Sequence, residues 1–100
     1  MVLAFDIGTT ALKGGLFDEG GAELARAEVP VRLTDREHPL YHEADANNWI
    51  SSLGLVAAQL ELARFGAPQA VVVSGNGPTL VPAGGEGRPL DFAMTWLDRR

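Results

Sequence analysis

The chain has 100 residues, of which 46% are hydrophobic, and a formal net charge of −5 at pH 7. This is the size of one small domain or part of one, with an ordinary globular composition. The negative charge argues against nucleic-acid binding, which needs a concentrated basic face. The lack of cysteine excludes disulfides and thiolate metal sites. The sequence holds no apolar run of the roughly 20 residues that a membrane helix needs. It opens with MVLAFDIG, which lacks the basic leader of a signal peptide, so we expect a cytoplasmic protein without membrane partners.

Three strands joined by short turns are predicted at the N-terminus. Residues 2–8 form an apolar run with one aspartate, which is typical of a strand buried on both faces. A Gly-Thr-Thr turn leads to a second strand over 11–17, where two adjacent glycines indicate a bend or a close backbone approach. An Asp-Glu-Gly-Gly turn leads to a third strand over 22–31. This order predicts an antiparallel meander.

The middle and the end of the chain predict a helix, a strand and a hairpin, and so an α/β fold. Residues 32–44 are polar and are predicted to form a loop, after which Asp45 is a suitable N-cap. A helix is predicted over 46–65, because apolar residues recur there at steps of three and four: Trp49, Leu53, Val56, Leu60 and Ala63. Residues 69–74 predict a buried strand that, reached through a helix, runs parallel to the first strand. A β-hairpin over 79–96 completes the chain.

The first candidate site is the Asp-Ile-Gly-Thr-Thr turn over 6–10. Its backbone N–H groups can cradle phosphate oxygens, and the hydroxyls of Thr9 and Thr10 add donors. Asp6 is costly in an apolar strand unless it is paired or coordinates a cation, and it suits a hydrated Mg²⁺. Lys13 can supply a positive charge to the same pocket. The alternative is a plain β-turn in which Asp6 caps backbone amides.

The second candidate site is the Ser-Gly-Asn-Gly-Pro-Thr stretch over 74–79. It follows a predicted strand, and ligands of α/β sheets tend to lie beyond the carboxyl ends of strands. Asn76 can hydrogen-bond a substrate hydroxyl through both of its amide atoms. The alternative is an ordinary turn.

The third candidate site is Trp96-Leu97-Asp98-Arg99. An aromatic face beside a carboxylate and a guanidinium suits a sugar, by stacking and by hydrogen bonds to hydroxyls. The alternative is a core tryptophan followed by a surface ion pair.

Other polar and aromatic residues receive structural interpretations. His38 and His42 have the spacing of a helical metal pair, but the proline between them disfavours a helix, so both are expected to be loop residues. Glu43 and Asp45 are interpreted as solvated residues before the helix, and Trp49 as a core residue.

The order of these features resembles the N-terminal part of the FGGY carbohydrate kinases. The opening DIGTTALKGGLFDEGG is similar to the opening of that family. The loop that ends at Glu43 and Asp45, followed by Trp49, looks like the stretch before the family's first long helix. VVVSGNGPTLVPAGGEGRPLDFAMTWLDRR resembles its strand, substrate loop, hairpin and Trp-x-Asp-Arg signature. The resemblance covers essentially all 100 residues. It implies an incomplete ribonuclease-H-like domain of the actin-like ATPase fold.

The resemblance implies an ATP site and a sugar site. Asp6 would help to position the Mg²⁺ of MgATP through water. The phosphates of ATP would face Gly8, Thr9, Thr10 and Lys13. The sugar would be bound by Asn76, Gly77, Pro78, Trp96, Asp98 and Arg99. Gly77 and Pro78 depart from the family because they offer no side-chain hydrogen bond where it usually reads its substrate, so the resemblance does not identify the sugar.

The implied function is the transfer of the γ-phosphoryl group of ATP to a sugar or polyol hydroxyl. The family's catalytic aspartate, second phosphate loop and second lobe are not among these 100 residues, so the chain alone is expected to be inactive. One alternative is a noncatalytic module that senses a sugar or binds a partner, and another is a scaffold fragment. The family's sheet has a further parallel strand beyond the fourth. The fourth strand is therefore expected to be an exposed edge here, which favours self-association.

Overall fold

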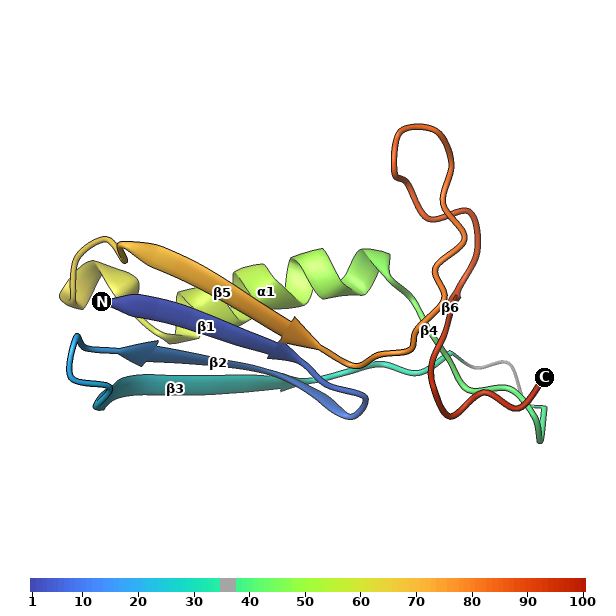
Figure 1. The fold of residues 1–100 in the computed structure, drawn as a ribbon, viewed down its shortest axis with the longest axis horizontal. Coiled ribbons are helices and arrows are strands. Elements are labelled where there is room, and N and C mark those ends of the chain that lie inside the picture. The colour runs from blue at the N-terminus through green and yellow to red at the C-terminus, as the bar shows by residue number, and fades with distance from the viewer. Residues whose placement is uncertain (35–37) are drawn as a thin grey trace.

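Three antiparallel strands and one parallel strand form the main sheet of the computed structural model, which describes residues 1–34 and 38–100 (Figure 1). The strand order is β3-β2-β1-β5. β1 pairs antiparallel with β2 and parallel with β5, so the predicted meander and parallel fourth strand are confirmed. Each strand lies within one residue of its predicted bounds: β1 (Val2–Ile7), β2 (Ala11–Phe17), β3 (Glu23–Pro30) and β5 (Ala70–Gly75).

The hydrophobic core lies between one face of the sheet and helix α1 (Asn47–Gln59). Val56 and Leu60 of the predicted apolar stripe are almost completely buried, and each contributes about 1.5–3 kcal/mol of transfer free energy. Gly14 explains how the helix comes this close, because a β-carbon there would lie 2.4 Å from Val56 Cγ1. The remaining core residues alternate along the strands: Leu3, Phe5, Leu12, Leu16, Ala27 and Val29.

Helix α1 is shorter than the predicted span of 46–65. Its N-cap position is Ala46, but the predicted capping carboxylate still acts there, because Asp45 Oδ1 accepts the Asn47 backbone N–H at 2.9 Å. The α-helix ends before Glu61, whose left-handed φ of 49° is incompatible with another α-helical turn. A short 3₁₀ helix η1 (Leu62–Arg64) follows, and Gly66, with φ of 89°, ends the segment as expected.

Two predictions of strand burial are wrong. Only alternate residues of β1 are buried, because α1 covers one face of the sheet and Asp6 is exposed on the other. β5 is not buried at all: it pairs with β1 alone, and Val71, Val72 and Val73 are 58%, 53% and 56% exposed. The expected exposed apolar edge is therefore present in the part of the chain that the structure describes.

A second, smaller sheet lies beyond the carboxyl ends of β1 and β5 (Figure 1). It pairs β4 (Glu43–Ala44) with β6 (Ala93–Met94), so the predicted loop over 32–44 ends in a short strand, and residues 35–37 of it lie outside the described residues. The predicted hairpin over 79–96 is present with few regular strand residues. Leu80 and Met94 exchange two backbone hydrogen bonds of 2.9 Å at its base. Among the described helices, none is long and apolar enough to cross a membrane.

Candidate functional site

The turn after β1 and the loop after β5 lie side by side, because parallel neighbouring strands end at the same edge of the sheet. The Asn76 N–H donates to Ile7 O at 3.1 Å and carries the strand pairing into the loop. The Gly8 N–H donates to Ala11 O at 3.0 Å and closes the β1–β2 turn. A β-carbon at Gly8 would lie 2.6 Å from that same oxygen, so this turn needs glycine.

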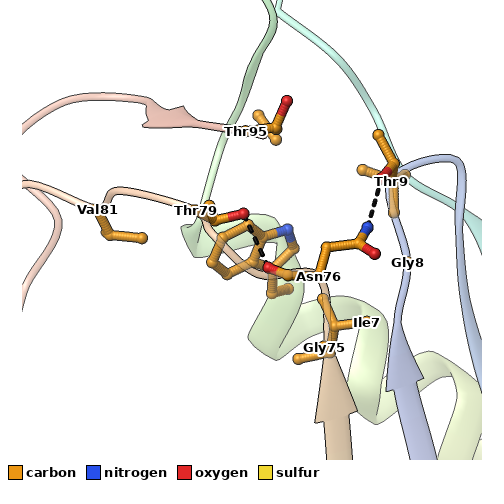
Figure 2. A pocket seen from close by; sticks show the side chains of 11 residues that line it. Ile7, Gly8, Thr9, Gly75, Asn76, Thr79, Val81 and Thr95 are labelled. Carbon is orange, nitrogen blue, oxygen red and sulfur yellow. Dashed lines mark hydrogen bonds between the residues drawn. The ribbon is translucent and has the colours of Figure 1, made fainter. Parts of the chain in front are cut away.

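A pocket of about 180 Å³ opens where these two segments meet the small sheet (Figure 2). Its 11 described lining residues are all uncharged. The Thr79 hydroxyl donates to the Asn76 carbonyl at 2.9 Å and closes the loop on the pocket (Figure 2). The lining residues come from five parts of the chain: Ile7, Gly8, Thr9, Val31, Ala44, Trp49, Gly75, Asn76, Thr79, Val81 and Thr95. The lining is mostly apolar with a few amide and hydroxyl groups, which suits a neutral ligand that has an apolar face and a small number of hydrogen-bonding groups.

Three of the predicted site residues meet at the mouth of this region. Thr9 Oγ1 accepts a hydrogen bond from Asn76 Nδ2, as Figure 2 shows, and a second one from Trp96 Nε1 at 3.1 Å. Trp96 is 54% exposed, so its ring is open to solvent and is not a core residue. The structure thus joins the candidate phosphate turn to both candidate sugar segments through one hydroxyl.

Asp6 and Lys13 lie on the open face of the main sheet. They face each other across the β1–β2 pairing and line a hollow of about 440 Å³ that also includes Ser74 of β5. Thr10 is exposed, and its backbone oxygen accepts the Val31 N–H at 2.9 Å, which ties the turn to the end of β3. A carboxylate and an ammonium group are therefore available to a ligand on this face of the sheet.

The remaining predicted sugar residues are placed differently. Gly77 and Pro78 follow Asn76 in the exposed loop, while the Arg99 backbone N–H donates to Leu40 O at 2.8 Å. Asp98 is occupied within the chain: Arg100 Nη2 donates to its Oδ2 at 2.7 Å, and the His42 N–H donates to the same oxygen at 2.9 Å. Its carboxylate acts here to fold the C-terminal segment against the loop before α1.

Sequence reasoning missed the role of Glu43. This residue is 4% exposed instead of solvated, and its Oε1 accepts a hydrogen bond from Arg100 Nη2 at 2.7 Å. The same guanidinium stacks 4.0 Å above the ring of Tyr41. His42 was interpreted as a loop residue. Its Nδ1 atom lies 2.6 Å from Thr95 Oγ1 and forms a hydrogen bond with it. Together these contacts fix the segment that carries Trp96.

The Asp98 carboxyl makes a pH-dependent contribution to stability. The hydrogen bonds from Arg100, supported by the His42 amide, hold the pKa of Asp98 well below its ordinary value near 3.9. A carboxyl with a lowered folded-state pKa stabilises the folded chain above its ordinary pKa, and this contribution is lost as the pH falls below about 4. We expect the stability difference between wild type and Asp98→Asn to be constant from pH 7 to about 5 and to shrink below about 4. Thermal unfolding across this range measures it, and a constant difference down to pH 2 would contradict the assignment.

Comparison with known proteins identifies the family. The family model for the N-terminal domain of the FGGY family of carbohydrate kinases matches residues 1–100. An erythritol kinase of Brucella abortus (strain 2308) is 32% identical over 104 residues, covering all of this chain and 20% of the relative. A solved xylulose kinase from Rhodospirillum rubrum superposes with a TM-score of 0.90 at 27% identity, covering 99% of this chain and 21% of that one. A xyloylose kinase from Brucella ovis gives 0.90 at 28% identity, over 98% and 21% of the two chains.

These residues have the sheet, helix and hairpin of the first part of an actin-like ATPase domain. The chain belongs to the FGGY family of carbohydrate kinases. It spans about a fifth of the length of the relatives that it matches.

Proposed function

We propose that these residues form the first phosphate turn and part of the sugar site of an ATP-dependent carbohydrate kinase. The observation that carries this proposal is the meeting of Thr9, from the turn after β1, with Asn76 and Trp96 at one edge of the sheet. A kinase must hold the phosphoryl donor and the acceptor hydroxyl together, and here residues suited to each are in contact. The uncharged pocket beside them supports a neutral sugar or polyol as the acceptor.

An activity assay on the protein that carries this segment tests the proposal directly. The protein should convert ATP to ADP only in the presence of an acceptor from a panel of tetritols, pentoses, pentitols, hexoses and glycerol. The 100-residue chain alone should be inactive, because the family resemblance places the base and the second phosphate loop that phosphoryl transfer needs outside these residues. ATP hydrolysis that ignores every acceptor would argue for a different member of the actin-like class.

The noncatalytic alternative predicts a different result for the isolated chain. A sugar-sensing module binds its ligand without ATP, and calorimetric titration with MgATP and then with each sugar distinguishes the two. Sugar binding by a chain whose longer form transfers no phosphate would favour the sensing role.

Asp6 is proposed to hold the hydrated Mg²⁺ of MgATP. Mg²⁺ keeps several waters and binds through one or two carboxylates and the substrate's phosphates, which suits a single exposed carboxylate beside the phosphate turn. The ion would neutralise charge on the transferring phosphoryl group, and Lys13, opposite Asp6, adds a second positive charge.

Asp6→Asn should lower the affinity of the enzyme for Mg²⁺ about 10- to 100-fold, the usual effect of losing an outer-sphere partner of a metal. The Mg²⁺ concentration that gives half-maximal rate should rise by the same factor. The measurement is the Mg²⁺ concentration giving half-maximal rate at saturating ATP and sugar. Asp18→Asn, in the turn between β2 and β3, is the matched control and should leave this value unchanged. Equal magnesium dependence in wild type and Asp6→Asn would remove Asp6 from the site.

We also propose that the 100-residue chain self-associates through β5. Among residues 1–34 and 38–100 this strand has a neighbour on one side only, and three consecutive valines on it are more than half exposed. Pairing with the same strand of a second copy would satisfy the backbone groups of both free edges at once and shield the flanks of the valine side chains, and an exposed apolar edge invites such pairing.

A further inference from the structure

The Thr9 hydroxyl has an unusual set of neighbours. It receives the side-chain N–H of Asn76, 67 residues away in the chain, and the indole N–H of Trp96, 87 residues away. Both groups approach the same oxygen, Oγ1, from segments that follow different strands. The backbone around Thr9 is fixed separately by the Gly8–Ala11 hydrogen bond, so these contacts orient the side chain of a turn that is already closed.

This arrangement fixes the polarity of the hydroxyl. A threonine hydroxyl has one O–H donor and two acceptor lone pairs, whereas the indole nitrogen can only donate. With N–H groups from Asn76 and Trp96 on the oxygen, both lone pairs are in use. The one hydrogen bond that Thr9 can still make is through its own proton, and the partner of that proton must be an acceptor.

We propose that Asn76 and Trp96 are positioning residues, which act through Thr9 by holding its hydroxyl as a donor toward a phosphate oxygen. The inference rests on the proposed function, in which the turn of Thr9 faces the phosphates of ATP. It assigns the indole N–H of Trp96 to the phosphate turn, which leaves only the exposed ring face of Trp96 for the sugar. Trp96 then serves both reactants: its ring contacts the sugar, and its N–H acts on ATP through Thr9.

The contact itself is tested by NMR on this chain, labelled with ¹⁵N. The indole N–H of Trp96 should shift and exchange faster with solvent in Thr9→Val, which removes the acceptor, and should keep its wild-type position in Thr9→Ser. The backbone N–H of Ala22, which Asp18 accepts in the turn between β2 and β3, is the internal reference. A Trp96 indole signal that is the same in wild type and Thr9→Val would overturn the proposal.

The role in the reaction is tested by a double-mutant cycle in the protein that carries this segment. Trp96→Phe keeps the ring and removes only the N–H, so we expect kcat to fall about threefold to tenfold, the value of one hydrogen bond, with the sugar KM unchanged. Thr9→Val should lower kcat by at least as much, and Thr9→Ser should restore it. In the Thr9→Val background, Trp96→Phe should have no further effect, because its route through Thr9 is gone.

Other outcomes separate this inference from the function on which it rests. Independent effects of Trp96→Phe and Thr9→Val in an active enzyme would overturn the positioning role and leave the kinase proposal intact. A raised sugar KM with unchanged kcat in Trp96→Phe would do the same, since the indole edge would then contact the sugar. A wild-type protein that phosphorylates no acceptor would instead overturn the proposed function.

Discussion

Gly14→Ala should destabilise the chain by about 1–3 kcal/mol, the usual cost of forcing an extra carbon into a packed core. The added β-carbon would lie 2.4 Å from Val56 Cγ1 and 3.3 Å from the ring of Phe5. Val56 is completely buried, so it has no open space into which to move. The helix must therefore be displaced from the sheet. Denaturant unfolding followed by circular dichroism measures the loss.

Two variants make this prediction specific. In Gly14→Ala combined with Val56→Ala, the loss should be smaller than the sum of the two single losses, because each substitution offsets the other's misfit. Gly54→Ala is the matched control: a β-carbon there meets nothing within 4 Å, and the substitution should raise stability by up to about 1 kcal/mol through helix propensity. Equal stability of Gly14→Ala and wild type would show that the helix does not pack on Gly14 as described.

Val72→Lys should convert a self-associating chain into a monomer. Val72 lies in the middle of β5 and is 53% exposed, and a lysine at the centre of a strand edge disfavours edge-to-edge pairing by placing two like charges near each other. We expect the molar mass of the wild-type chain from light scattering to rise with concentration toward that of a dimer. The mass of Val72→Lys should stay at about one chain.

Leu90→Lys provides the control for this test. Leu90 is also an exposed hydrophobic residue, but it lies in the hairpin, away from the main sheet. Its replacement should leave self-association unchanged. Nonspecific association through exposed hydrophobic residues would instead make both lysine variants equally monomeric. A wild-type chain that remains monomeric at high concentration would contradict pairing through β5.

The sequence predicted those parts of the fold whose causes are local. Short turns between apolar runs specify the meander, and a strand reached through a helix specifies the parallel position of β5. The burial of β5 was mispredicted because apolar composition reports the environment for which a strand is suited. It does not report how many neighbours the 100 residues provide. The helix end was mispredicted because Glu61 adopts a left-handed conformation that its side chain does not signal.

The sequence predicted which segments form the candidate site, but it did not predict the side-chain contacts between them. The turn after β1 and the loop after β5 were found because Gly-rich polar stretches follow apolar strands. The ion pair of Glu43 with Arg100 joins residues 57 apart, and a carboxylate before a helix looks solvated when its partner is unknown. Likewise, nothing in the residue types of Asn76 and Trp96 indicates that both donate to one threonine. Such pairings arise from the register of the strands.

The tip of the hairpin, residues 84–88, is held by backbone hydrogen bonds within itself. The Gly84 N–H donates to Arg88 O at 2.9 Å and closes the tip. The tip protrudes from the small sheet in Figure 1. Below it, the Leu80–Met94 pair secures the base independently. Chain length is therefore free to vary at this tip, since residues gained or lost there change neither the strand register nor the pocket. We expect an inserted peptide tag at Gly85 and Glu86 to leave Thr9 and its partners undisturbed.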